Sequence, residues 1–171
     1  MGHESIKVAV IDAGPLIHLK EIERLPLLDM FDRLWLPNAV WQETVGKARI
    51  TSTQIERLPN LQRMSVAEGP LKIFLHAEKL EKLHAGEREC LYVCKQEKVS
   101  IILTDDLAVR DAARSMEITP VGSLGIVVRA YSSGILSLEE AKHTIYNLQT
   151  ISSLFVTKAI VEKAIEQLGN L

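Results

Sequence analysis

Acidic residues in this chain stand where hydrophobic runs end. The run over residues 7–11 stops at Asp12, and a second apolar run over residues 99–103 is followed closely by Asp105 and Asp106. Runs rich in Val and Ile that are bounded in this way predict buried parallel strands. In open α/β sheets, ligands bind at the carboxyl ends of such strands. Carboxylates gathered there would repel one another unless a cation held them, so the sequence indicates a divalent-metal site.

The overall composition suits one compact domain with a short appendage. The chain has 171 residues, of which 47% are hydrophobic, enough to build a core. Its 20 Lys and Arg nearly balance its 22 Asp and Glu, which leaves a net charge of −2. A global basic field of the kind that drives non-specific nucleic-acid binding is therefore excluded. A nucleic-acid partner would need a local patch, or metal ions that supply positive charge.

No segment of the sequence predicts a membrane or secretory location. No apolar run approaches the roughly 20 residues that span a bilayer. Residues 1–4 lack the basic stretch and apolar stretch of a signal peptide. We therefore expect a cytoplasmic protein. Cys90 and Cys94 lie four apart on a predicted helix without further Cys or His at ligand spacing, and we expect them to be buried as small hydrophobic residues.

Strand and helix patterns alternate through the first 134 residues. The expected strands cover residues 6–12, 34–36, 63–67, 99–104 and 119–121, and the expected helices cover residues 25–32, 38–45, 86–97, 107–116 and 124–132. Asn38 is the expected N-cap of the helix over 38–45. Repeated strand–helix alternation predicts an α/β fold with a parallel sheet.

The pattern changes after Gly134 and becomes entirely helical. Apolar residues recur at helical spacing over residues 138–148 and 156–168, and Ser137 with Glu140 forms a capping box. We expect a domain over residues 1–134 and a helical hairpin over residues 135–171 that packs on the core or on a second subunit. Exposed apolar faces on this hairpin favour a homodimer.

Asp12 is the strongest candidate for a metal ligand, because a carboxylate directly after an apolar strand is costly to bury without a partner. Its structural alternative is to cap the following helix. Asp105 and Asp106 are adjacent, so their side chains diverge and one of them is expected to face the site while the other caps the helix over 107–116. Thr104 is positioned to hydrogen-bond a carboxylate or a metal-bound water.

The remaining candidates are weaker on their own. Glu43 lies on a helix soon after the second strand. Glu87 and Glu89 lie in the first turn of a helix, where the helix dipole alone accounts for negative charge. Arg110 shares a helix face with Arg114 and could offset the acidic cluster, bind phosphate or remain solvated.

With these residues in view, the chain resembles PIN-domain proteins, and most closely an uncharacterised prokaryotic branch related to toxin ribonucleases. The resemblance rests on residues 10–17, 37–43, 86–89, 103–110 and 122–125 and on the helical tail. It implies a PIN-like three-layer α/β/α fold with a central, mainly parallel sheet of about five strands. It also implies an acidic quartet of Asp12, Glu43, Glu87 and one of Asp105 and Asp106. The family's Thr-x-Asp pattern selects Asp106. The third position is commonly Asp, whereas this chain offers Glu87 or Glu89.

The resemblance implies a nuclease that uses Mg²⁺ or Mn²⁺ to hydrolyse single-stranded RNA, often as the toxin partner of an antitoxin protein. Hard divalent cations prefer oxygen ligands, and such ions promote phosphodiester hydrolysis without a side-chain nucleophile. The alternative is a PIN-like binding or regulatory module with weak or no catalytic activity. A dehalogenase-type phosphatase is disfavoured, because Gly14 stands where its second Asp would be.

Overall fold

The computed structural model describes residues 6–171, and it describes side-chain surroundings from Val8 onward. Its centre is a five-stranded, entirely parallel sheet with the strand order β3-β2-β1-β4-β5. The strands are β1 (Ile6–Ile11), β2 (Phe31–Pro37), β3 (Leu61–Met64), β4 (Ile101–Leu103) and β5 (Thr119–Val121). In the central strand, Ala9, Val10 and Ile11 are fully buried. Burial on both faces explains why β1 is a continuous apolar run.

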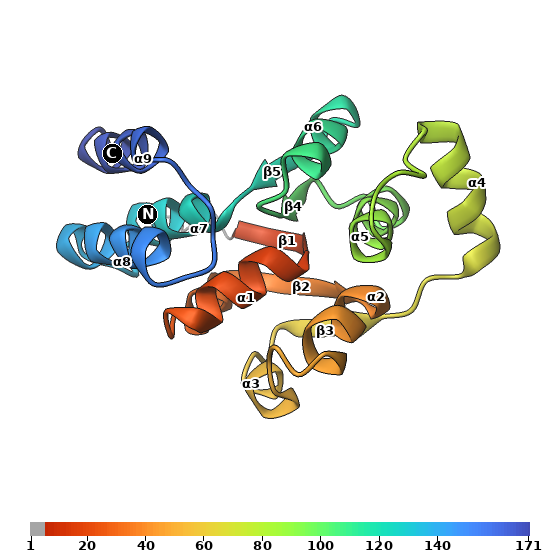
Figure 1. Ribbon diagram of the computed structural model, residues 1–171, viewed down its shortest axis with the longest axis horizontal. Coiled ribbons are helices and arrows are strands. Elements are labelled where there is room, and N and C mark those ends of the chain that lie inside the picture. The colour runs from red at the N-terminus through yellow and green to blue at the C-terminus, as the bar shows by residue number, and fades with distance from the viewer. Residues whose placement is uncertain (1–5) are drawn as a thin grey trace.

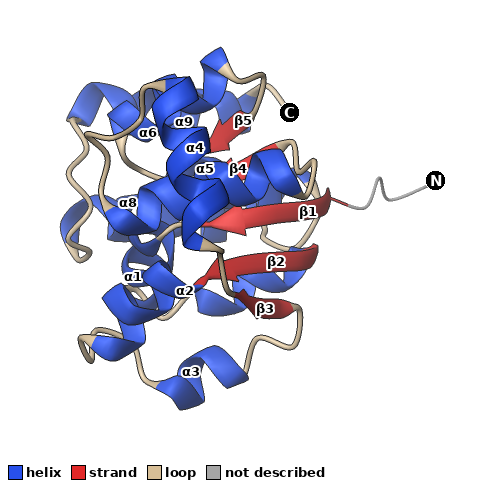
Figure 2. Cartoon of the chain, turned by 90° about the vertical axis from the view of Figure 1, so that its right-hand side faces the viewer, coloured by secondary structure: helices blue, strands red, loops and turns tan. Residues whose placement is uncertain are grey.

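Helices cover both faces of this sheet, as Figures 1 and 2 show. One face carries α5 (Ala85–Gln96), with α4 (Glu68–Glu78) packed outside it and α6 (Leu107–Ser115) beside it. The other carries α1 (Ala13–Glu21) and α7 (Ser123–Ser132). The short elements are η1 (Leu25–Met30), α2 (Asn38–Trp41), η2 (Gln42–Gly46) and α3 (Ser52–Glu56). The predicted α/β/α fold with a parallel sheet of five strands is confirmed.

Helices α8 (Leu138–Thr150) and α9 (Lys158–Gly169) form the predicted helical tail, and both pack on α7. The predicted capping box is present, because the Ser137 hydroxyl accepts from the Glu140 N–H and the Glu140 carboxylate accepts from the Ser137 N–H. The division at residue 134 stays a prediction. No helix among residues 6–171 is both long and apolar enough to cross a membrane.

Several predicted boundaries were wrong. Residues 25–30 form a 3-10 helix, and β2 begins at Phe31, inside the segment predicted as helix. The strand predicted at 63–67 lies at Leu61–Met64. Asn38 is not an N-cap, because Pro37 occupies that position and the Asn38 side chain accepts a hydrogen bond from Arg63.

Both cysteines are buried on α5, as predicted. Burial raises the pKa of Cys94 to about 12 and that of Cys90 well above its ordinary value. Thiols in such surroundings stay protonated, so they pack as small apolar groups.

Candidate metal centre

Asp12 lies at the carboxyl end of the central strand and is only 6% exposed. Its Oδ1 accepts a 2.8 Å hydrogen bond from the Ala13 N–H at the start of α1, so the expected capping role is present. The pKa of Asp12 is raised to about 6, mainly by burial and to a smaller extent by the negative charges of Glu87 and Glu43, while hydrogen bonds from Ala13 and Thr104 act in the opposite direction. A buried carboxylate near two other carboxylates is an unfavourable arrangement that a cation would relieve.

Thr104 connects the ends of the two central strands. The Asp12 N–H donates to the carbonyl of Leu103, the last residue of β4, at 2.9 Å, which places the following residue, Thr104, beside Asp12. The fully buried Thr104 hydroxyl donates to Asp12 Oδ2 at 2.9 Å and accepts from the Asp106 N–H at 3.3 Å. Thr104 therefore positions the carboxylate of Asp12 and the backbone of Asp106.

The two adjacent aspartates diverge as expected. Asp105 accepts hydrogen bonds from the Ser123 N–H at 2.7 Å and the Ser123 hydroxyl at 2.6 Å, and it pairs with His18 Nδ1 at 2.7 Å. Asp106 is exposed, and its Oδ1 caps α6 through the Val109 N–H at 3.0 Å. The structure therefore ties Asp105 to α1 and α7 and leaves Asp106 with an oxygen free to face outward.

Glu43 lies in the π-helical segment η2, a kind of segment that is frequent at functional sites. A Cβ added to Gly86 would lie 3.1 Å from Glu43 Oε2, so the Glu43 carboxylate rests against the first turn of α5. No hydrogen bond to this carboxylate is found within residues 6–171. Glu43 is the least constrained of the candidate ligands.

Glu87 and Glu89 have different surroundings on α5. Glu87 accepts from the His84 N–H at 2.8 Å and contacts His84 Nδ1 at 3.1 Å in a capping box. Glu89 accepts a 2.7 Å hydrogen bond from the Ala39 N–H and so caps α2. Glu89 is thus turned toward α2, whereas Glu87 acts electrostatically on Asp12.

His84 was missed as a neighbour of this site. Its bond and charge contact with Glu87 raise its pKa, and the negative charges of Glu43 and Asp106 add to the effect. Three of the candidate carboxylates therefore act electrostatically on the exposed His84 imidazole. The spacing of His84 and Glu87, typical of a capping box, was the available sequence signal.

A PIN-domain family model matches residues 8–170, which is nearly the whole chain. The chain belongs to the PIN-domain family. A search of curated proteins finds no matching relative. The matched segment of this PIN domain includes the sheet except for the first two residues of β1, all the candidate carboxylates and the helices α8 and α9.

The carboxylates of this PIN domain are close enough to interact electrostatically but are not gathered on one point. Within the described part of the chain, no three Asp, Glu, His or Cys side chains are placed to hold one ion. Glu87 pairs with His84 at 3.1 Å. The donor chemistry nevertheless fits a hard divalent cation, because every candidate offers carboxylate oxygen.

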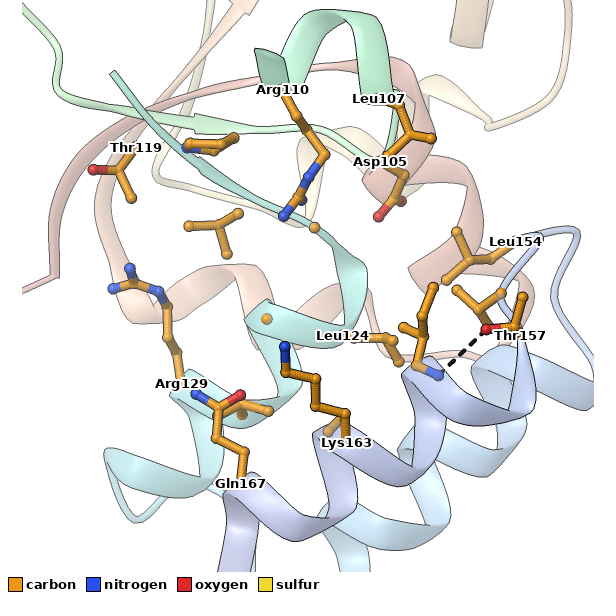
Figure 3. Close-up of a pocket in the computed structure, with 18 of the residues that line it drawn as sticks. Asp105, Leu107, Arg110, Thr119, Leu124, Arg129, Leu154, Thr157, Lys163 and Gln167 are labelled. Carbon is orange, nitrogen blue, oxygen red and sulfur yellow. Dashed lines mark hydrogen bonds between the residues drawn. The ribbon is translucent and has the colours of Figure 1, made fainter. Parts of the chain in front are cut away.

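Arg110 is connected to the candidate site of the PIN domain through the backbone of Thr104. Its guanidinium donates to the Thr104 carbonyl at 3.3 Å, and Arg110 lines a cavity together with residues of β5, α7 and α9 (Figure 3). Burial and the positive charge of Arg114 lower the pKa of Arg110. Arg110 supports the loop that carries Asp105 and Asp106, through the Thr104 carbonyl.

Proposed function

We propose that this PIN domain is a metal-dependent endoribonuclease that hydrolyses phosphodiester bonds of single-stranded RNA. The observation that carries the proposal is Asp12, a buried carboxylate at the carboxyl edge of the sheet with a pKa near 6 and two further carboxylates acting on it. Buried groups with strongly shifted pKa values concentrate at functional sites. Asp12, Glu43, Glu87 and Asp106 would hold Mg²⁺ or Mn²⁺.

Each of these residues is prepared differently for that role. Asp12 is oriented by the Thr104 hydroxyl, and Asp106 is held by its bond to the start of α6. The Glu43 carboxylate makes no hydrogen bond within residues 6–171, and Glu87 would have to exchange its contact with His84 for the ion. A bound divalent ion supplies Lewis-acid chemistry at a phosphodiester and offsets its negative charge. With such an ion held by these carboxylates, a chain with a net charge of −2 would be able to engage RNA.

The biological setting is part of the same proposal. A cytoplasmic ribonuclease of this kind would act as the toxin of a toxin–antitoxin pair and be held inactive by an antitoxin protein. Tyr146 and Ile151 at the end of α8 are at least half exposed, which supports a homodimer built on this helix. A strictly monomeric profile in light scattering would refute the dimer.

One observation favours a second candidate function, a binding or regulatory module without catalysis. Glu87 is engaged by His84, and no three ligand side chains of the described chain converge. Calorimetric titration with Mn²⁺ separates the two functions. Binding by the wild type that is lost in Asp12→Asn supports the nuclease, whereas no binding at millimolar metal supports the module.

Cleavage of an unstructured RNA tests the proposal directly. The wild type is expected to cleave it with Mn²⁺ and not in excess chelator, and Asp12→Asn is expected to be inactive. Asp29→Asn, which removes an exposed carboxylate on η1, is the matched control and is expected to cleave like the wild type. Cleavage that persists in chelator, or that Asp12→Asn retains, would contradict metal-dependent catalysis at this site.

A further inference from the structure

A cavity of about 890 Å³ lies beside the candidate metal centre, between α6, β5, α7 and α9 (Figure 3). Its volume falls within the roughly 300–1,000 Å³ of typical ligand pockets. The carboxylates proposed to hold the metal do not line it, although Asp105, which is adjacent to Asp106, does. The cavity therefore needs its own explanation.

The charges around this cavity are strongly unbalanced. Four cationic side chains line it, namely Arg110, Arg114, Arg129 and Lys163. Figure 3 shows Arg110 and Lys163 directed into the cavity from opposite walls. The acidic residue among the described lining residues is Asp105. Its carboxylate already accepts a hydrogen bond from Ser123 and pairs with His18.

Only part of this positive charge is compensated within residues 6–171. Arg114 pairs with Asp111 at 3.0 Å in an exposed position, where such a pair contributes little. No ion pair to Arg129 or Lys163 is found among the described residues. Burial and the positive charge of Arg114 lower the pKa of Arg110, although the negative charges of Asp105 and Asp111 act in the opposite direction. An anion in the cavity would relieve this repulsion.

The same cavity has an exposed aromatic wall. Phe155, in the connection between α8 and α9, lines it and is 92% exposed. A base stacked on an aromatic ring contributes about 1–3 kcal/mol to single-strand binding, whatever its sequence. Cationic groups beside an exposed aromatic ring match a nucleotide, which combines a phosphate with a flat base.

We propose that this cavity binds a phosphorylated nucleotide, with its phosphate held by Lys163, Arg129 and Arg110 and its base against Phe155. The inference rests on the proposed function, because the nucleotide would be part of the RNA strand that reaches the carboxylates. The cavity and the candidate metal centre are joined by two hydrogen bonds, since Arg110 donates to the carbonyl of Thr104 and the hydroxyl of Thr104 donates to Asp12. Free nucleotide and RNA strand share this chemistry, and the test separates them.

Binding is measured by fluorescence anisotropy and calorimetry in excess chelator, so that no RNA is cleaved. The probes are AMP, a 5′-phosphorylated oligoadenylate and polyglutamate. The variants are Arg129→Gln combined with Lys163→Gln, and Phe155→Ala. The matched controls are Lys158→Gln, a lysine of α9 that does not line the cavity, and Ile73→Ala, an exposed apolar residue of α4 that does not line it either. Thermal unfolding confirms that each variant folds.

The wild type and both controls are expected to bind the oligoadenylate alike. The double variant is expected to lower the slope of log affinity against log salt by about 1.4, because two phosphate contacts to a single strand are lost. Phe155→Ala is expected to weaken binding by at least about fivefold. If AMP also binds, and the double variant and Phe155→Ala weaken its binding in the same way, the site is assigned to free nucleotide. If only the oligoadenylate binds, the site is assigned to an RNA strand.

Oligoadenylate binding that the double variant and Phe155→Ala leave unchanged would overturn the inference. Polyglutamate that binds as tightly and is weakened by the same variants would also overturn it, because the cavity would then bind an acidic polypeptide. Failure of the ribonuclease proposal looks different, since it appears as absent Mn²⁺ binding or cleavage and leaves nucleotide binding in chelator intact.

Discussion

The Thr104 hydroxyl donates a 2.9 Å hydrogen bond to Asp12 Oδ2, across the boundary between β4 and β1. Both residues are buried, and each follows directly on the last residue of its strand. Because the bond favours the charged form of Asp12, it lowers the pKa of this carboxyl against the effect of burial, which raises it. The metal centre that we propose depends on this contact.

Replacement of Thr104 tests that dependence. Thr104→Val removes the donor and keeps the shape, and we expect it to weaken Mn²⁺ binding by about tenfold or more, the usual effect of losing a group that orients a ligand. Thr104→Ser keeps the hydroxyl and is the matched control. Calorimetry provides both affinities. Equal affinities of Thr104→Val and wild type would show that the bond does not prepare the site.

Asp12 also makes the stability of the metal-free protein depend on pH. Its folded-state pKa of about 6 lies above the ordinary 3.8, so the folded protein binds more protons and loses stability as pH rises between these values. A shift of about two units corresponds to about 3 kcal/mol of destabilisation above this range. Asp12→Asn should therefore stabilise the metal-free protein at about pH 8, by up to that amount, and have little effect at about pH 4.

Thermal unfolding followed by circular dichroism in chelator measures this difference. Added Mn²⁺ should reverse the order at the higher pH, because only the wild type gains stability by binding the ion. A constant difference between the two proteins at all pH values would contradict the raised pKa.

The two glutamates of α5 should separate into a metal ligand and a structural cap. Glu89→Ala loses the hydrogen bond to the Ala39 N–H and is expected to cost about 1 kcal/mol of stability with unchanged Mn²⁺ affinity. Glu87→Gln is expected to abolish detectable Mn²⁺ binding. Chemical denaturation and calorimetry on both variants decide the matter, and the opposite assignment would follow if Glu89→Ala alone lost the metal.

Asp105 and Asp106 should separate in the same way. Asp105→Ala leaves His18 and Ser123 without their shared partner and is expected to cost about 2 kcal/mol of stability. Asp106→Asn keeps an oxygen that can cap α6, so it should remain stable while it loses Mn²⁺ affinity. Metal binding that survives in Asp106→Asn but not in Asp105→Ala would reverse these roles.

The parts of the fold that sequence predicts well are those where one physical effect dominates. The strands β1 and β4 are short apolar runs because helices cover both faces of the sheet. The start of β2 was missed because Asp32 and Arg33 are exposed there and interrupt the apolar pattern. The edge strand β3 is half exposed and polar, so its limits leave a weak signal.

The candidate site was predictable only as far as local patterns reach. The strand end at Asp12 and the divergence of Asp105 from Asp106 follow from local geometry. The bond from Ala39 to Glu89 spans 50 residues, and the contact of His18 with Asp105 spans 87. Such contacts arise from tertiary packing and leave no trace in local spacing. For that reason the sequence left the choice between Glu87 and Glu89 open.

The most direct test of the proposed metal centre is an anomalous difference map from crystals soaked in Mn²⁺. The account predicts a peak in contact with Asp12, with Glu43, Glu87 and Asp106 around it and with Glu87 turned away from His84. No peak at Asp12 while Mn²⁺ binds elsewhere, or a site built on Asp105 and Glu89, would contradict it.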